Sequence, residues 1–419
     1  MTFSLRCHMC HAEYPASALF VCSNCMGPLE CHFDYDTISK TLTREIIERG
    51  PRSMWRYRAL LPIEGEPRTG LHSGFTPLVK ADRLAKRLGV RELYVKDDSV
   101  NHPTCSYKDR VVSVAATRAV ELGFTEFACA STGNLAGSVA SHAARLGLSC
   151  SVFIPDDLEA GKVAGAAVYH PRIIAVRGNY DDVNRLCTQV ADQYGWGFAN
   201  INLRAYYAEG AKTYGFEIAE QLGWKFPKHV VSPVAGGTLL PRILKGFEEF
   251  KTIGLVEGDL PRIYAAQAAG CAPVVKAFEK VTRTQDKDDE FPDPVKPNTI
   301  AKSIAIGNPA DGFQVVRALR STGGNAAMVE EDDIISGIRL LAETEGIFTE
   351  PAGGVTVSAT KQLIDRGIIP RDESIVICVT GNGYKTVEVL AGKTVQPINI
   401  GRSLADFEAA VAPKAVAHR

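Results

Sequence analysis

The sequence predicts an α/β fold in which open, parallel sheets are covered by helices, preceded by a small metal-binding segment. From residue 126 onward, short apolar runs of strand length alternate with longer stretches whose apolar residues have helical spacing. Neighbouring parallel strands need a crossover helix, so this alternation indicates parallel sheets covered on both faces. The first 35 residues differ, because they contain two closely spaced pairs of cysteines.

Composition and charge exclude several classes of function. The chain has 419 residues, of which 45% are hydrophobic, and its 47 basic and 48 acidic residues leave a net charge of -1. Such a balance provides no general electrostatic attraction to nucleic acid or to a membrane surface. The N-terminus does not resemble a secretion signal, and no apolar run reaches membrane-spanning length. We expect a soluble, cytoplasmic protein that binds neither nucleic acid nor membrane.

Residues 1–35 are predicted to form a zinc-ribbon-like segment. Cys7, Cys10, Cys22 and Cys25 form two Cys-x-x-Cys pairs, and each pair can present two thiolates to one tetrahedral ion. Four protein ligands leave no open position, so the zinc would be structural. The alternative is that these are ordinary reduced thiols. A nucleic-acid-binding role of the ribbon is a second alternative, although few basic residues flank the cysteines.

Strands and helices are expected in regular order along the rest of the chain. A helix-like stretch at 36–49 and a polar linker lead to a strand at 91–96, and residues 281–298 are expected to form an exposed loop. The remaining strands are predicted at residues 126–130, 149–154, 172–176, 197–202, 230–234, 262–267 and 374–380. The remaining helices are predicted at 135–146, 161–169, 181–194, 210–222, 239–250 and 330–345.

Lys108 is the first candidate for a catalytic group. It ends a short polar run, and apolar residues at helical spacing follow from Val111 onward, which places Lys108 at the start of a buried helix. Burial lowers the pKa of a lysine and makes its amine available to form an imine with a carbonyl group. The alternative is an ordinary cation at a helix start.

Two loops that follow predicted strands are candidates for binding anions. Ser131, Thr132 and Asn134 precede a predicted helix, and their hydroxyl, amide and backbone N–H groups suit a substrate carboxylate. Helix capping alone would also explain Ser131 and Thr132. The run Ala235-Gly236-Gly237-Thr238 lies between a strand and a helix, so its backbone N–H groups could surround a phosphate. It matches neither a Walker A loop nor a GxGxxG fingerprint.

Thr380 completes the set of candidate groups. It ends a strongly apolar strand and precedes Gly-Asn-Gly, so its hydroxyl could reach a heterocycle nitrogen; otherwise it is only a strand end. An imine-forming lysine, a phosphate-binding loop, a carboxylate-binding helix end and a neutral donor for a ring nitrogen are together what pyridoxal 5'-phosphate and an amino acid require.

On these residues the chain resembles the fold-type II pyridoxal-phosphate enzymes of the tryptophan-synthase β-like superfamily and, within it, the threonine synthase family. The resemblance extends over about residues 70–390. It is most specific at Asn-His-Pro-Thr-Cys-Ser-Tyr-Lys-Asp-Arg (residues 101–110), at Ser-Thr-Gly-Asn (131–134) and at Thr-Gly-Asn-Gly (380–383). An N-terminal Cys-x-x-Cys pair is also found in long bacterial members of this kind.

The resemblance implies a role for each candidate residue. Lys108 would form the imine with the cofactor, Asn134 would bond the cofactor's phenolic oxygen, and Thr380 would face the pyridine nitrogen. Ser131 and Thr132 would bind the substrate carboxylate or phosphate. The cofactor phosphate would be held by the backbone of Val234, Ala235, Gly236, Gly237 and Thr238.

The resemblance also implies the domain organisation and a homodimer. After the ribbon, residues 36–96 would form an N-terminal arm and the start of the large domain, and residues 97–200 an inserted small domain. Residues 201–395 would complete the large, cofactor-binding domain, and residues 396–419 would be a C-terminal tail. Each of the two domains would contain its own open parallel sheet.

The chain departs from the family pattern at positions that bear on the substrate. Cys105 and Tyr107 replace the more usual residues beside Lys108, and Tyr206-Tyr207 precede the helix where some members have a phosphate-binding arginine. Arg204 and Lys212 are therefore our candidates for a substrate phosphate.

The expected reaction converts O-phospho-L-homoserine and water to L-threonine and phosphate. Alternatives are a dehydratase or β-replacement enzyme acting on threonine, serine or phosphoserine, and a non-catalytic zinc-ribbon binding protein.

Overall fold

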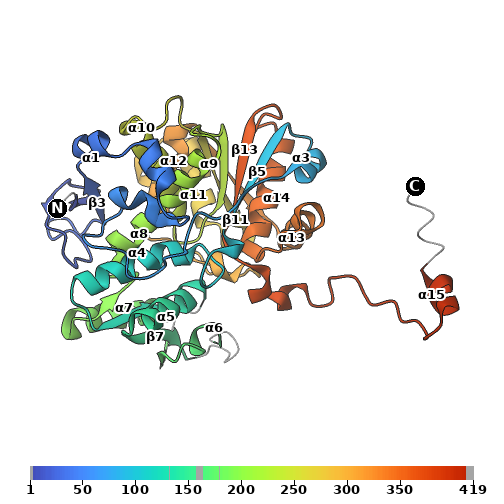
Figure 1. Cartoon of the computed structure of the whole chain (residues 1–419), viewed down its shortest axis with the longest axis horizontal. Helices are drawn as coiled ribbons and strands as arrows, with labels where there is room; N and C mark the ends of the chain where they lie inside the picture. The colour runs from blue at the N-terminus through green and yellow to red at the C-terminus, as the bar shows by residue number, and fades with distance from the viewer. Residues whose placement is uncertain (1–2, 132, 157–163, 179, 412–419) are drawn as a thin grey trace. The chain divides into compact units, whose positions relative to one another are not determined.

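The computed structural model describes residues 3–131, 133–156, 164–178 and 180–411 (Figure 1). Contacts between residues divide the chain into two compact units, Met1–Thr386 and Val387–Arg419. The described residues of the second unit form one α-helix, α15 (Leu404–Ala410), and include no buried side chain. No helix in the described part of the chain is both long enough and apolar enough to cross a lipid bilayer.

The N-terminal segment of the first unit is a three-stranded antiparallel sheet, as expected for a ribbon. Its strands β1 (Phe3–Cys7), β2 (Glu13–Tyr14) and β3 (Leu29–Phe33) have the order β2-β1-β3. Every second residue of β1 and β3 is buried, which is the pattern of a sheet with one face against a core. Two short helices follow, α1 (Tyr35–Thr41) and α2 (Arg44–Arg49), where the sequence predicted one helical stretch.

The larger of two further sheets has six strands in the order β12-β11-β10-β13-β5-β4. All neighbours are parallel except the edge strand β4, which is antiparallel to β5. The strands are β4 (Leu78–Lys80), β5 (Glu92–Asp97), β10 (His229–Pro233), β11 (Arg262–Ala268), β12 (Asn325–Val329) and β13 (Ser374–Val379). The associated helices are α3 (Asp82–Leu88), α9 (Thr213–Gln221), α10 (Leu239–Thr252), α11 (Pro273–Thr284), α12 (Gly312–Thr322), α13 (Glu331–Glu345) and α14 (Pro351–Asp365).

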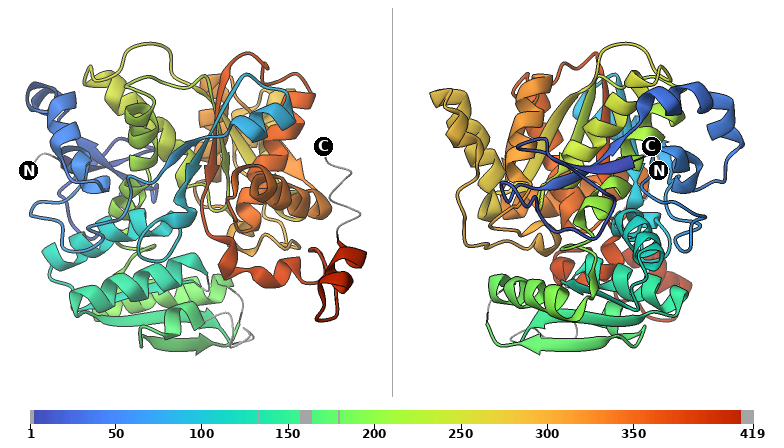
Figure 2. Two further views of the ribbon diagram at one scale, coloured as in Figure 1. Left: turned by 45° about the vertical axis from the view of Figure 1, so that its right-hand side comes forward. Right: turned by 90° about the vertical axis from the view of Figure 1, so that its left-hand side faces the viewer.

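The smaller sheet has four parallel strands in the order β8-β7-β6-β9 and is built from the middle of the chain (Figure 2, green). Its strands are β6 (Glu126–Ala130), β7 (Ser149–Pro155), β8 (Arg172–Val176) and β9 (Gly197–Phe198), and its helices are α5 (Asn134–Leu146), α6 (Ala164–Ala167) and α7 (Tyr180–Tyr194). The predicted α/β class with two mainly parallel sheets is thus confirmed. The proposed domain boundaries remain predictions.

Helix α4 (Lys108–Glu121) packs against α5 on one side and α8 (Arg204–Gly210) on the other. The α4–α8 contact is close, because a Cβ on Gly210 would lie 2.4 Å from the carbonyl oxygen of Arg110. Only glycine allows two backbones to approach in this way. The predicted helix at 210–222 corresponds to α9, which begins only at Thr213, while Gly210 is the last residue of α8.

Several other elements have bounds in the structure that differ from the predicted ones. The strand expected at 197–202 keeps only Gly197–Phe198, and the helix expected at 161–169 lies partly outside the described residues. The loop expected at 281–298 begins as the last turn of α11, where Val281 is buried. Glu290 in the same loop is also buried, because it pairs with Arg317 and Arg320 on α12.

Four buried charged groups connect the six-stranded sheet to α4 and α9. Arg110 bonds Asp98 through Nε at 2.7 Å and Glu217 through Nη2 at 2.8 Å, while Lys96 Nζ lies 2.6 Å from Glu217 Oε2. The relative exposure of all four side chains is 0%. Burial alone would raise the pKa of Glu217, but Arg110 and Lys96 lower it to about 2.

Replacing Glu217 by Gln should destabilise the fold by about 3–5 kcal/mol, because it leaves Lys96 and Arg110 buried with too few negative partners. Since the pKa of Glu217 is lower in the folded than in the unfolded chain, its stabilising contribution is complete above about 4.5. It is lost as pH falls from there toward about 2. Urea unfolding of both proteins at pH 7 and at acid pH measures this difference, which should shrink toward low pH. Asp365→Asn, in an exposed pair with Lys361, is the control and should change little.

Candidate active site

Lys108 is the first residue of α4, and its amine contacts two phenol groups. Nζ lies 2.8 Å from the hydroxyl oxygen of Tyr107 and 2.9 Å from that of Tyr207. Tyr107 is the adjacent residue, whereas Tyr207 is buried on α8 and reaches Lys108 because α8 crosses α4. The half-buried amine is thus held between residues that are far apart in the sequence.

The prediction that the pKa of Lys108 is lowered is wrong. Desolvation does act to lower it, but the oxygens of Tyr107 and Tyr207 outweigh desolvation and raise the pKa of Lys108 well above its usual range. The sequence indicated the burial but not the second tyrosine. Lys108 therefore holds its proton in this arrangement and must release it before its amine can react.

The loop before Lys108 pairs directly with the turn that contains Thr380. The Tyr107 N–H donates to the Thr380 carbonyl at 2.9 Å, and the Asn382 N–H donates to the Cys105 carbonyl at 3.1 Å. Two segments singled out in the sequence thus lie side by side, because β5 and β13 are neighbours in the sheet. Thr380 is buried, and its hydroxyl has no hydrogen-bond partner among the described residues.

Asn134, the first residue of α5, is the next predicted site residue. Its amide nitrogen donates to both carboxylate oxygens of Glu350 at 3.2 and 3.0 Å, and its amide oxygen accepts from Lys385 Nζ at 2.9 Å. Glu350 lies against the turn after Thr380, since its N–H donates to the Gly381 carbonyl. Burial raises the pKa of Glu350. Asn134, Glu350 and Thr380 therefore form one continuous group with Lys108.

Ser131 is half-buried beside Asn134, and its hydroxyl accepts a long bond from the Gly133 N–H at 3.4 Å. Gly133, not Ser131, occupies the N-cap of α5, so the capping alternative does not explain Ser131. Thr132, the other predicted carboxylate-binding residue of this loop, lies outside the described residues.

The glycine-containing loop has open backbone donors. Within the described chain, the N–H groups of Ala235, Gly236 and Gly237 have no hydrogen-bond partner, and a Cβ on Gly236 would meet no atom within 4 Å. Gly237 has φ +93 and lies against Asp311, where a Cβ would be 2.6 Å from the backbone. Helix α10 begins directly after this loop at Leu239. Free N–H groups at a helix start suit a phosphate.

Arg204 reaches this loop through Asp311. Arg204 Nη2 lies 2.7 Å from one oxygen of Asp311, and the Thr238 hydroxyl donates to the other at 2.9 Å. Burial alone would raise the pKa of Asp311, but Arg204 holds it below its usual range. The arginine offsets the negative charge of Asp311 near the phosphate-binding loop, so the structure places Arg204 with the other candidates.

Lys212, the second candidate for the substrate phosphate, is not part of this group of site residues. Its side chain is completely buried, and Nζ lies 2.7 Å from Glu209, 2.9 Å from Glu249 and 3.9 Å from the centre of the Phe33 ring. A lysine neutralised by two carboxylates and shielded from solvent has no free charge for a substrate phosphate.

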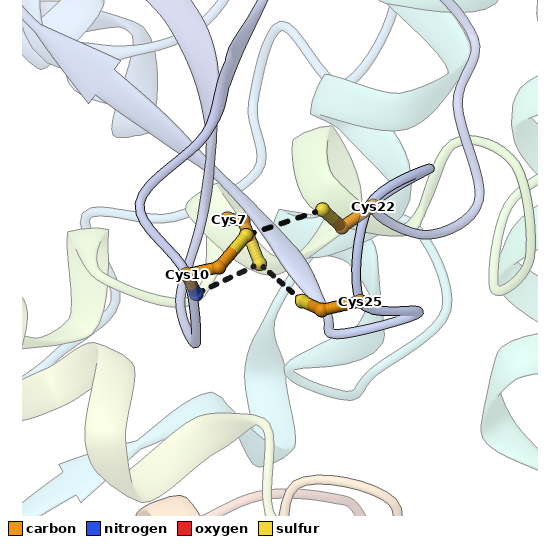
Figure 3. Close-up of side chains that lie close together, drawn as sticks. All are labelled: Cys7, Cys10, Cys22 and Cys25. Carbon is orange, nitrogen blue, oxygen red and sulfur yellow. Dashed lines mark hydrogen bonds between the residues drawn. The ribbon is translucent and has the colours of Figure 1, made fainter.

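The four N-terminal cysteines meet as a ribbon site requires (Figure 3). Their sulfur atoms all lie within 4.8 Å of one another, and the Cys7–Cys25 and Cys10–Cys22 sulfur pairs are 3.5 Å apart. Four thiolates around one zinc, each at about 2.3 Å, would place sulfurs about 3.8 Å from one another. The cluster fits a tetrahedral metal ion.

Comparison with known proteins identifies the family of this chain. The model of the family described as pyridoxal-phosphate dependent enzyme matches residues 70–381, well over half of the chain. The chain belongs to this family. The cofactor is therefore pyridoxal phosphate, and the expected cofactor and the expected superfamily are confirmed.

Relatives of this pyridoxal-phosphate enzyme include threonine synthases of two archaea. A threonine synthase of Methanosarcina acetivorans is 36% identical over 415 residues, covering 99% of this chain and 100% of the relative. Another, from Methanocaldococcus jannaschii, is 38% identical over 398 residues, covering 94% and 96%. Among solved structures, a threonine deaminase of Solanum lycopersicum superposes with a TM-score of 0.62 at 18% identity, covering 77% of this chain and 89% of that one. That likeness concerns the fold.

The residues present fit the cofactor. The Lys108 amine suits its aldehyde, and the buried Thr380 hydroxyl, which has no partner among the described residues, suits its ring nitrogen. The free backbone N–H groups of residues 235–237 suit its phosphate. Sequence reasoning missed Tyr207 and Asp311 as members of the site and gave Lys385 no role; for Glu350 it left open a loop beside the cofactor ring or a purely structural turn. Lys385 ends the Thr-Gly-Asn-Gly-Tyr-Lys run, and Glu350 precedes Pro-Ala-Gly, so both were visible beside known motifs.

Proposed function

We propose that this enzyme converts O-phospho-L-homoserine and water to L-threonine and phosphate, the reaction of the threonine synthases. The observation that carries the proposal is the similarity to two threonine synthases along essentially their whole length. The site agrees with it, because one reactive lysine, one open phosphate-binding loop and a nearby arginine suit a phosphorylated amino acid.

Bound pyridoxal phosphate supplies an electron sink for the carbon atoms of the amino acid. The loop from Val234 to Thr238 would hold its phosphate through N–H groups, and the Thr380 hydroxyl would meet its ring nitrogen as a neutral donor. A neutral partner would leave that nitrogen unprotonated. Asn134, oriented by Glu350 and Lys385, would bond the phenolic oxygen.

Lys108 would act as the base that moves protons at the substrate's α- and β-carbons once its amine is free. Ser131 and Thr132 would bind the substrate carboxylate. Arg204 would attract the substrate phosphate, since its guanidinium is partly exposed while Asp311 fixes its orientation. Water would then add at the β-carbon to give the product.

The test is to incubate the purified, cofactor-loaded enzyme with O-phospho-L-homoserine and to measure threonine and phosphate. We expect equal amounts of both. Serine, threonine and phosphoserine, the last with an added nucleophile, are the comparison substrates. If an oxoacid and ammonia form from threonine or serine while phosphohomoserine is unchanged, the enzyme is a dehydratase. Consumption of phosphoserine would instead indicate β-replacement.

We also propose that the enzyme works as a homodimer in the cytoplasm. The resemblance to fold-type II enzymes supports the dimer, and the lack of an apolar spanning helix among the described residues agrees with the location. Light scattering of the holoenzyme would test the dimer, with a mass of twice 45.3 kDa as the expected result.

A further inference from the structure

Release of a phosphate ester needs an acid as well as a base. When the carbon–oxygen bond of a phosphate monoester dianion breaks, the leaving oxygen would carry a third negative charge unless it receives a proton. General acid catalysis of such a step contributes about 10²–10⁴-fold. Lys108 is the base in the proposed function, so a separate group that exchanges protons with Lys108 is the natural donor.

Tyr207 has the position such a donor needs. Its hydroxyl oxygen is 2.9 Å from Lys108 Nζ, and it is buried on α8. Arg204, the candidate for the substrate phosphate, lies one turn earlier on the same helix, and residues three apart share a helix face. Helix α8 therefore presents, along one face, a cation for the phosphate and a phenol that touches the base.

We propose that Tyr207 is the acid that protonates the leaving phosphate, and that Lys108 then restores the proton to Tyr207; this rests on the proposed function. Lys108 Nζ takes a proton from the substrate β-carbon, and the electron pair of that C–H bond forms the carbon–carbon double bond. The γ-carbon–oxygen bond breaks with its pair on the phosphate oxygen. Tyr207 gives its O–H proton to this oxygen and regains one from the Lys108 ammonium.

The surroundings of the amine agree with this relay. Both phenol oxygens lie within hydrogen-bond distance of Lys108 Nζ, so a proton taken up by the amine can pass directly to a tyrosine without an intervening group. Tyr107 lies at a similar distance but belongs to the turn that pairs with Thr380, not to the helix that carries Arg204. We therefore assign the protonation of the leaving phosphate to Tyr207 and a positioning role to Tyr107.

The test compares two substrates on the Tyr207→Phe holoenzyme. One is O-phospho-L-homoserine; the other is vinylglycine, which already has the double bond and carries no phosphate. Tyr207→Phe should lower kcat for phosphohomoserine about 10²-fold or more with little change in KM. It should convert vinylglycine to threonine nearly as fast as the wild type.

Controls separate chemistry from folding and from cofactor binding. The visible spectrum of bound pyridoxal phosphate and borohydride labelling of Lys108 should match those of the wild type in Tyr207→Phe. Tyr206→Phe, its neighbour on α8, loses a hydroxyl that donates to the Ser17 carbonyl at 2.8 Å instead, and it should show no selectivity between the substrates.

Each other outcome decides against the relay. Equal losses with both substrates would make Tyr207 a positioning residue for Lys108, and a selective loss in Tyr107→Phe alone would move the acid to Tyr107. Full activity of Tyr207→Phe on phosphohomoserine would overturn the assignment while leaving the proposed function intact. A wild-type enzyme that does not consume phosphohomoserine would overturn both.

Discussion

Lys108→Ala is expected to abolish turnover, lowering kcat by at least about 10³-fold, because one amine serves both as the attachment point of the cofactor and as the base. The protein should also lose the borohydride-trapped adduct at this position and much of its yellow colour. Absorbance of the purified protein, peptide mapping after borohydride and the threonine assay measure these three effects.

Lys108→Arg is the matched control for charge. It keeps a cation between Tyr107 and Tyr207, yet a guanidinium does not form the imine, so this variant should fold with wild-type stability and remain inactive. Turnover retained in Lys108→Ala would contradict the proposed enzymology. Inactivity accompanied by a lowered Tm in both variants would instead indicate a structural role.

Removal of the ribbon metal is expected to destabilise α4 and α8 together. The loop between the two cysteine pairs docks on both helices: Arg118 of α4 donates to the Ala16 carbonyl at 2.7 Å, and Tyr206 of α8 donates to the Ser17 carbonyl at 2.8 Å. Structural zinc contributes on the order of 10 kcal/mol to the folding of small sites. Without the metal this loop loses the coordination bonds that fix its two ends, and both helices lose a hydrogen-bond partner.

Cys22→Ser should therefore lose bound zinc, melt at lower temperature and show faster amide exchange in α4 and α8. Elemental analysis, thermal unfolding and hydrogen exchange of the full chain check these outcomes. The control is Cys150→Ser on β7, a half-buried cysteine that is not part of the cluster, which should keep the metal. A chain that contains no metal when purified, yet melts unchanged after Cys22→Ser, would count against a structural ion.

The α/β class and the ribbon could be predicted because they depend on local patterns. Helix α14 could not, since its start combines two glycines with β-branched Val355 and Thr356, which locally disfavour a helix. Tertiary packing decides there: a Cβ on Gly354 would lie 2.4 Å from the carbonyl of Ile334, so α13 and α14 cross closely. Strand β12 was missed because its short Asn-Ala-Ala-Met-Val run has little strand character.

Site residues that follow neighbouring strands could be predicted from the sequence. Contacts between segments that are far apart in the sequence were harder to predict. Thr380 and the loop before Lys108 follow neighbouring strands, so their contact follows from topology. Tyr207 reaches Lys108 only through the α4–α8 crossing, which no local pattern indicates. The ion pair that neutralises Lys212 involves Glu209, only three residues earlier, so this partner could have been considered from the sequence.

Asp109 sets a limit on how this enzyme can change shape. Its carboxylate accepts the Thr104 N–H and hydroxyl at 2.9 and 2.8 Å, and the hydroxyl of Ser138 on α5 at 2.7 Å. These bonds tie the segment before Lys108 and the helix that starts at Asn134 to the same first turn of α4. Any closing movement around a ligand must therefore carry these three pieces as one rigid block, with the hinges outside it.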